Sequence, residues 1–470
     1  MRNLTFLLLL MIVFSSTANA QDKLSLTQCI NIAKSKNISL QQAQLSLASG
    51  KIQLDQSKTN RLPNLNGSGG HNYNFGRSID PFTNQFVNQS IQSNSFSLST
   101  NVTLFNGFQL QNTIKQNENN LRVAEKDLEV LNNNISLSVA TLYLQILLNE
   151  EQLKNSLQQK TLTEAQLKRA RQMYEAGNVS RSAVVNLEAQ MSNDDMNIVN
   201  AKNTIRNAYA QMATLLQITN YEDFTIENPA LTIPSNKTPT IEQIIEKSLL
   251  TMPEIERDNL KMKSSLIGLE IAKGAYYPRL SLFGSVNTVY SQSRKERYDV
   301  TTNFMTIGVV ESTNQNVISP FSSYKLRTTP FGQQLSDNFG QGIGLSLSVP
   351  IYNNNRIKNN IALSKINYQN NQLGLQNTEQ QLKNEIVTAY ANYENANAQY
   401  TASLKNEAAQ KLNYEFTNDR FEAGLLNSVE LLNAKNQWSN AQINASQAKF
   451  EYVFRKLILD FYQGNPLSIK

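Results

Sequence analysis

The residue types that most often catalyse reactions or bind metal ions are scarce in this chain. It has one histidine, His71, and one cysteine, Cys29, among 470 residues. No nucleophile is paired with His71 in a recognisable pattern, and the carboxylates do not cluster at metal-ligand spacings. We therefore interpret His71 as a strand or loop residue and expect no cofactor, no metal and no enzymatic activity. An exported enzyme would need a convergent polar site, which the sequence does not show.

Cys29 and the overall charge exclude further classes of protein. Cys29 aligns with Ile244 in a second copy of the same pattern, which predicts a small core residue, and a single cysteine excludes a disulfide within the chain. The formal net charge is +6, and the lysines and arginines are spread along the chain. This distribution lacks the clustered basic patch of a nucleic-acid-binding protein.

One carboxylate, Glu430, lies at a predicted helix start, where it could bind or repel ions. Glu430 lies six residues after Gly424, at the start of the last predicted helix, with Asn427 and Asn433 close in sequence. A glutamate at a helix start is favoured by the helix dipole alone.

The elements that must position these residues occur twice. Leu26 to Pro63 is echoed by Ile241 to Pro278 at an offset of 215 residues. Two later motifs return at an offset of 247 residues: Val102-Thr-Leu-Phe-Asn-Gly as Val349-Pro-Ile-Tyr-Asn-Asn, and Tyr174-Glu-Ala-Gly as Phe421-Glu-Ala-Gly. A fixed offset indicates two copies of one structural unit. The change in offset predicts a 32-residue insertion in the second copy, within 291–336.

These repeats set the predicted domain limits. Residues 1–20 read as a signal peptide, with Arg2, an apolar stretch from Leu4 to Phe14, and Ala18-Asn19-Ala20 as the cleavage site. The first repeat spans 21–218, a proline-containing linker spans 219–239, and the second repeat spans 240–470. Each repeat is predicted to run helix, two strands, long helix, helix.

The long helices are predicted over 108–173 and 355–420. The first stretch contains no proline or glycine, and its 66 residues would extend about 100 Å as a helix. Its apolar residues follow two adjacent heptad stripes, which suits a helix packed between two neighbours. Each long helix ends in a glycine, Gly177 or Gly424, at a helix C-cap position. Ser180 and Asn427 are then expected to cap the helices over 181–217 and 428–462.

The strands are predicted from strict alternation of apolar and uncharged polar residues. Residues 95–104 and 342–349 alternate in this way, with 64–79 and 279–290 as their expected partners. About 10 residues is the length of a membrane β-strand, although a soluble sheet on a core would alternate too. Four strands are too few to close a barrel, and open edges are not tolerated in lipid. A membrane location would therefore require oligomerisation.

Together these features resemble the TolC family of outer-membrane efflux proteins over essentially all of 21–470. The resemblance rests on the order of the elements, on the two strand-exit motifs, and on the two glycine turns at identical spacing. It implies a mixed α and β fold, in which four strands per chain form a twelve-stranded membrane barrel in a homotrimer, continuous with a periplasmic helical tunnel. It also implies an outer-membrane location in contact with lipid, and no catalysis.

The resemblance further implies partners. They would be a periplasmic adaptor protein and an inner-membrane transporter, such as a resistance-nodulation-division pump or an ABC exporter. The periplasmic tips that meet the adaptor would comprise six residues: Tyr174, Gly177, Asn178, Phe421, Gly424 and Leu425. Cargo is left open among drugs, metal ions and proteins. A non-conducting coiled-coil scaffold or adhesin at the cell surface is the alternative that helical periodicity alone would permit.

The chain departs from the family pattern at the expected gate. Where the best-known members carry Asp-x-x-Asp after the second glycine, this sequence has Glu430 and Asn433. The family's arginine near that glycine matches Leu426, and an aspartate of the first turn matches Ala183. The closing network of those members is therefore not assumed here. In the three-fold assembly that the resemblance implies, three copies of Glu430 facing the axis would attract cations and repel anions at the constriction. If Glu430 did not line the pore, Asn427 and Asn433 would be the residues to examine.

Overall fold

A computed structural model describes residues 23–79, 84–88, 90–229, 239–465 and 467. The predicted signal peptide and residues 230–238 of the predicted linker lie outside the described residues. Within that part of the chain, no helix has the length and apolar character needed to cross a membrane. The chain divides into two compact units, the helical unit (up to residue 51, 119–264 and 368 onwards) and the sheet unit (52–118 and 265–367).

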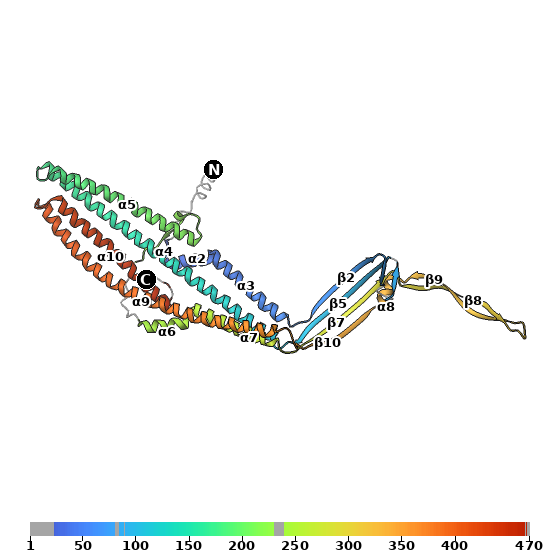
Figure 1. Cartoon of the computed structure of the whole chain (residues 1–470). Coiled ribbons are helices and arrows are strands. Elements are labelled where there is room, and N and C mark those ends of the chain that lie inside the picture. Colours follow the sequence, from blue (N-terminus) through green and yellow to red (C-terminus); the bar gives the residue numbers. More distant parts are fainter. Residues whose placement is uncertain (1–22, 80–83, 89, 230–238, 466, 468–470) are drawn as a thin grey trace, which may run out of the picture. The chain divides into compact units, whose positions relative to one another are not determined.

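The two repeats give two matching sets of helices (Figure 1). The first set is α2 (Leu26–Lys36), α3 (Ile38–Thr59), α4 (Gln109–Glu175) and α5 (Arg181–Leu216). The second set is α6 (Ile241–Thr251), α7 (Pro253–Gly274), α9 (Arg356–Glu422) and α10 (Ser428–Tyr462). Helices α4 and α9 each have 67 residues, which confirms the predicted long helices within two residues at each end.

Each repeat is predicted to begin with one helix, but in the first repeat two helices precede the strands, because the chain breaks at Asn37. Asn37 is extended, and its side-chain oxygen accepts hydrogen bonds from the backbone N–H of Ser39 and Leu40. Asn37 thus ends α2 and caps α3. The second repeat breaks at the equivalent place, with Met252 extended and Pro253 at the first position of α7.

Four antiparallel strands form the main sheet in the order β10-β7-β5-β2. They are β2 (Asn64–Asn74), β5 (Ile91–Phe105), β7 (Arg279–Ser291) and β10 (Gly340–Ser348). The predicted pairings of β2 with β5 and of β7 with β10 are confirmed, and β5 joins the two hairpins by pairing with β7. Among the described residues, β2 and β10 are the outer strands. A short pair, β3 (Arg77–Ile79) with β4 (Phe86–Asn88), follows β2.

The register gives this sheet an apolar face and a polar face. Directly opposed residues of antiparallel strands share a face. The apolar face includes Leu65, Phe96, Leu98, Val286, Ile343 and Leu345. The polar face includes Asn66, Ser68, Ser95, Ser97, Ser99, Asn287, Ser285 and Ser346. The side chains of Leu98 and Ile343 are 44% and 80% exposed, so the apolar face is uncovered there within one chain.

Residues 291–336, where the insertion is expected, contain a separate hairpin and most of a short helix. Strands β8 (Lys295–Val309) and β9 (Asn316–Thr328) pair with each other, and α8 (Phe331–Asp337) follows. Phe331 of α8 packs against the rings of Phe96 and Tyr290 on the apolar face of the main sheet.

Equivalent positions of the two repeats are buried in the core of the helical unit. Cys29 and its counterpart Ile244 are both fully buried, which confirms the interpretation of Cys29 as a core residue. Burial raises the pKa of the Cys29 thiol to about 12. The start of the predicted linker packs on this core as a 3₁₀ turn, Tyr221–Asp223, and β6 (Thr225–Ile226), which pairs in parallel with β1 (Lys23–Leu24).

Candidate functional site: helix tips, polar sheet face and a buried ion pair

Both long helices end in the same hydrogen-bonded turn. Gly177 has a φ of 80° and Gly424 a φ of 73°, the left-handed conformation expected of C-cap glycines. The N–H of Asn178 donates to the carbonyl oxygen of Met173 at 2.8 Å, and the N–H of Leu425 donates to the carbonyl oxygen of Arg420 at 2.9 Å. This pattern is the Schellman motif in both repeats.

The two turns are neighbours within the helical unit. A Cβ added to Gly424 would lie 3.9 Å from the methyl group of Met173, whereas one added to Gly177 would meet nothing within 4 Å. Tyr174, Gly177, Asn178, Gly424 and Leu425 are exposed. The turns therefore offer a paired surface at one end of the helical hairpins.

Phe421 differs from the other predicted tip residues because its side chain is buried. It is 1% exposed and packs in a core cluster with Tyr414, Leu431 and Trp438. The Tyr414 and Trp438 rings stack with centroids 4.9 Å apart. Phe421 therefore anchors the turn from inside and presents no side-chain surface to a partner in this conformation.

The residues expected at a constriction lie at the start of α10. Asn427 caps the helix, since its side-chain oxygen accepts from the N–H groups of Val429 and Glu430 at 2.9 and 3.0 Å. Its amide nitrogen also donates to Glu430 Oε1 at 2.9 Å. Asn427, Glu430 and Asn433 are all exposed in the single chain. Ser180 occupies the equivalent cap position in the first repeat, but its hydroxyl makes no capping bond and pairs with Ser182 instead.

The polar face of the main sheet carries hydroxyl, amide and glycine positions and one exposed aromatic side chain. Phe283 faces Gly344 across the pair of strands β7 and β10. A Cβ added to Gly344 would lie 2.6 Å from Phe283 Cζ, so the ring lies directly over the glycine. The alternation of apolar and polar residues along β7 is therefore broken at Phe283 and Gly284, because a large apolar side chain lies on the polar face there and a glycine on the apolar face.

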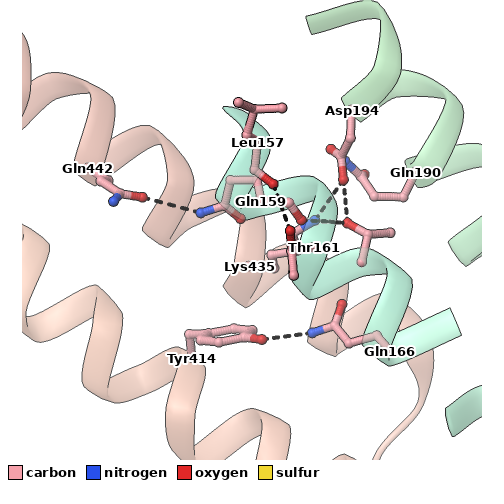
Figure 2. A network of polar contacts seen from close by, with 10 residues as sticks. Leu157, Gln159, Thr161, Gln166, Gln190, Asp194, Tyr414, Lys435 and Gln442 are labelled. Carbon is pink, nitrogen blue, oxygen red and sulfur yellow. Dashed lines mark hydrogen bonds and ion pairs between the residues drawn. The ribbon is translucent and has the colours of Figure 1, made fainter. Parts of the chain in front are cut away.

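A buried ion pair that the sequence analysis missed joins helices of the two repeats (Figure 2). Lys435 Nζ of α10 lies 3.0 Å from Asp194 Oδ2 of α5, with the two side chains 1% and 5% exposed. Thr163 of α4 contacts both groups, and Gln190 donates to the second carboxylate oxygen at 2.8 Å. Burial lowers the pKa of Lys435, and the bond to Asp194 opposes that effect.

The ion pair belongs to a polar stripe along α4 that faces α9 and α10. Asn155 donates to Ser446, Gln159 donates to Gln442, and Gln166 donates to the Tyr414 hydroxyl at 2.9 Å. Figure 2 shows Lys435 between Gln159 and Gln166 along this seam. The sequence does contain a signal for this ion pair, which is a charged residue at a core heptad position. Lys435 lies four residues after the buried Leu431 and three before the buried Trp438.

In the part of the chain that the structure describes, no group of three or more histidine, cysteine, aspartate or glutamate side chains is placed to hold a metal ion. His71 lies in β2 and hydrogen-bonds to Asn94 of β5, which confirms its interpretation as a strand residue.

A family model described as outer membrane efflux protein matches residues 29–216 and again 244–462. The chain belongs to the outer membrane efflux protein family. This membership confirms the TolC-family resemblance, the mixed α and β fold with its internal repeat, and the outer-membrane location. The family is one of transport channels and not of enzymes.

Individual relatives of this outer membrane efflux protein are distant. Outer membrane protein TolC of Escherichia coli is 23% identical over 322 residues, which cover 68% of this chain and 59% of TolC. Toxin and drug export protein A of Aggregatibacter actinomycetemcomitans is 26% identical over 112 residues, or 24% of each chain. The matched parts thus span less than two thirds of either relative.

Solved structures share the fold over nearly the whole chain. The crystal structure of CusC superposes with a TM-score of 0.75 at 15% identity, covering 96% of both chains. That of VceC from Vibrio cholerae gives a TM-score of 0.74 at 13% identity, covering 94% of this chain and 96% of VceC. At such identities, the likeness concerns the fold alone.

Proposed function

We propose that three copies of this outer membrane efflux protein form an exit duct, which passes substrates from an inner-membrane transporter across the periplasm to the outside. The observation that carries the proposal is the four-stranded sheet with β2 and β10 as outer strands. In lipid, the unpaired backbone groups of these two strands would have no water to bond. Pairing β10 of one copy with β2 of the next would close a twelve-stranded barrel in a trimer.

The two faces of the sheet support an aqueous lumen. Serine, asparagine and glycine dominate one face, and an exposed apolar row that includes Leu65, Leu98 and Ile343 dominates the other. In a closed barrel the apolar row would meet lipid and the polar face would line water. The reverse arrangement would place exposed leucines in water and serines in hydrocarbon.

The partners follow from the helix tips. A periplasmic adaptor protein would bind the paired turns through Tyr174, Gly177, Asn178, Gly424 and Leu425, which are exposed. The inner-membrane transporter would be a resistance-nodulation-division pump or an ABC exporter. The name of the relative described as a toxin and drug export protein supports both efflux and secretion, so cargo stays open between them.

We place the ion-selective constriction at Glu430. In a three-fold assembly this exposed carboxylate would recur three times, next to the exposed Asn427 and Asn433. Its bond to the Asn427 amide supports an equally simple structural role at the helix start. The selectivity measurement in the Discussion separates the two roles.

Native mass measurement in mild detergent and conductance in a planar bilayer test the proposal together. A trimer that conducts ions is expected. A monomer in mild detergent would contradict the closed barrel. A stable trimer without conductance would favour the alternative of a surface scaffold or adhesin.

A further inference from the structure

The hairpin β8–β9 divides into a charged root and an uncharged arm. The root, 295–299 with 324–328, holds six charged residues. Arg327 bonds to Glu296 at 2.7 Å, and Lys325 pairs with Asp299 at 2.8 Å. The arm, residues 300–323, contains a single charged residue, Glu311, in the turn between the strands. The root therefore carries the charges of the hairpin, whereas the arm consists almost entirely of apolar and uncharged polar residues.

The arm exposes large apolar side chains on both of its faces. Nine are exposed by 40% or more: Val300, Phe304, Met305, Ile307, Val309, Val310, Val317, Ile318 and Phe321. The register places Phe304 and Ile318 on one face, and Met305 and Phe321 on the other. An isolated two-stranded hairpin is marginally stable in water, so these side chains call for a covering surface.

We propose that the arms of the three copies pack against one another and form an interface that extends the duct beyond the main sheet. This inference rests on the trimer proposed above. The arm's root is fixed to its own sheet unit, because Arg294 bonds to Asp337 of α8 at 2.8 Å and accepts a bond from the N–H of Thr329 at 3.0 Å. A trimer would therefore repeat the root three times around one axis and hold the arms at high effective concentration.

The composition of the arm favours other copies of this chain as its partner. Identical residues approach one another near a three-fold axis, where like charges would repel. The arm meets this condition, because its residues carry almost no charge from Val300 onwards. Contact with an unrelated partner would not require an uncharged arm. Membrane lipid is a poorer occupant, because a two-stranded hairpin leaves backbone groups unpaired along both edges.

The contact is expected through side chains, because both edges of the hairpin are poor templates for strand addition. Pro320 removes an N–H from β9, and the register of β8 is irregular near Val300 and Ile307. Interdigitating side chains, such as Phe304, Ile318 and Phe321, would then carry the interface.

Cysteine crosslinking in the full-length chain tests this interface. Thr306→Cys places a thiol beside Ile318, and the native Cys29 serves as an internal control because it is fully buried. Oxidation in native membranes should give a two-chain band on a denaturing gel, since two of three thiols near an axis can pair. Adding Phe304→Asp and Ile318→Asp should lower the crosslink yield at least tenfold. Adding Leu326→Asp instead, which puts one aspartate beside Arg297 in the root, should leave the yield unchanged.

Native mass measurement of the same variants separates this inference from the proposed function. A trimer that never crosslinks through the arm, or one whose crosslink survives both aspartates, would overturn the arm interface while the duct stands. A thiol reagent should label Thr306→Cys poorly in the trimer. If nanodisc lipid, and not the other chains, blocks this labelling, the arm interface would also be overturned. A monomer would remove the basis of both proposals.

Discussion

Lys435 and Asp194 form a buried ion pair between the last helix of the second repeat and the last helix of the first. Removing one partner of such a pair leaves an uncompensated buried charge, which is more costly than replacing both. The pair therefore makes the packing of the two repeats specific, because a shifted register between α5 and α10 would separate the charges.

Lys435→Met should destabilise the helical unit by about 3–5 kcal/mol, because Asp194 would stay buried without its cation. Adding Asp194→Asn should recover most of that loss, since asparagine is neutral and can still accept the bond from Gln190. Urea unfolding followed by circular dichroism provides the measurement. The surface pair Lys160–Asp195, at 2.8 Å and with side chains 30% and 54% exposed, gives the control, and Lys160→Met should leave the midpoint nearly unchanged. Equal losses for the single and double variants would contradict the role of the ion pair.

Gly177→Val and Gly424→Val should each cost about 1 kcal/mol or more, because both glycines have positive φ and valine is strained there. If the turns bind the adaptor, crosslinking to the adaptor should also fall at normal protein levels. Gly374→Val in the interior of α9 is the control for helix disruption away from the tips. Folded variants that crosslink to the adaptor as well as the wild type would show that the two glycines are structural only.

Glu430→Gln should lower cation preference in single-channel recordings and weaken block by a multivalent cation, if three copies of Glu430 surround the axis. The glutamine keeps the oxygen that accepts from the Asn427 amide, so the helix cap should survive. Glu422→Gln on α9 removes an equal charge from the other side of the turn and should have a smaller effect. Unchanged selectivity and block in Glu430→Gln would move the search to Asn427 and Asn433.

Gly344→Ala should destabilise the main sheet by about 1–3 kcal/mol, because the new methyl group would overlap the Phe283 ring. Combining it with Phe283→Ala should restore much of the stability by removing the overlap. Gly342→Ala is the control, since its methyl group would meet Ser285 Oγ at an ordinary 3.7 Å. Thermal loss of the strand signal in detergent reports the result. A Gly344→Ala variant as stable as Gly342→Ala would show that the ring moves freely.

The sequence by itself determined the long helices, the helices that follow them, the strands of the main sheet and the order of these elements. Heptad spacing without proline located α4 and α9, period-two alternation located β5 and β10, and the repeated Glu-Ala-Gly located both Schellman turns. These are local signals, because each depends on residues within a few turns or pleats of one another. The repeat offset also predicted that Cys29 and Ile244 occupy equivalent positions in the core, and both are fully buried.

Only the tertiary structure decided which distant residues meet. Lys435 and Asp194 are 241 residues apart, and nothing local shows that their side chains share one buried site. Phe421 looked like a tip residue from its place in the motif, yet packing with Tyr414 and Trp438 buries it. Burial and charge pairing depend on the faces that helices present to one another, which sequence spacing alone does not fix.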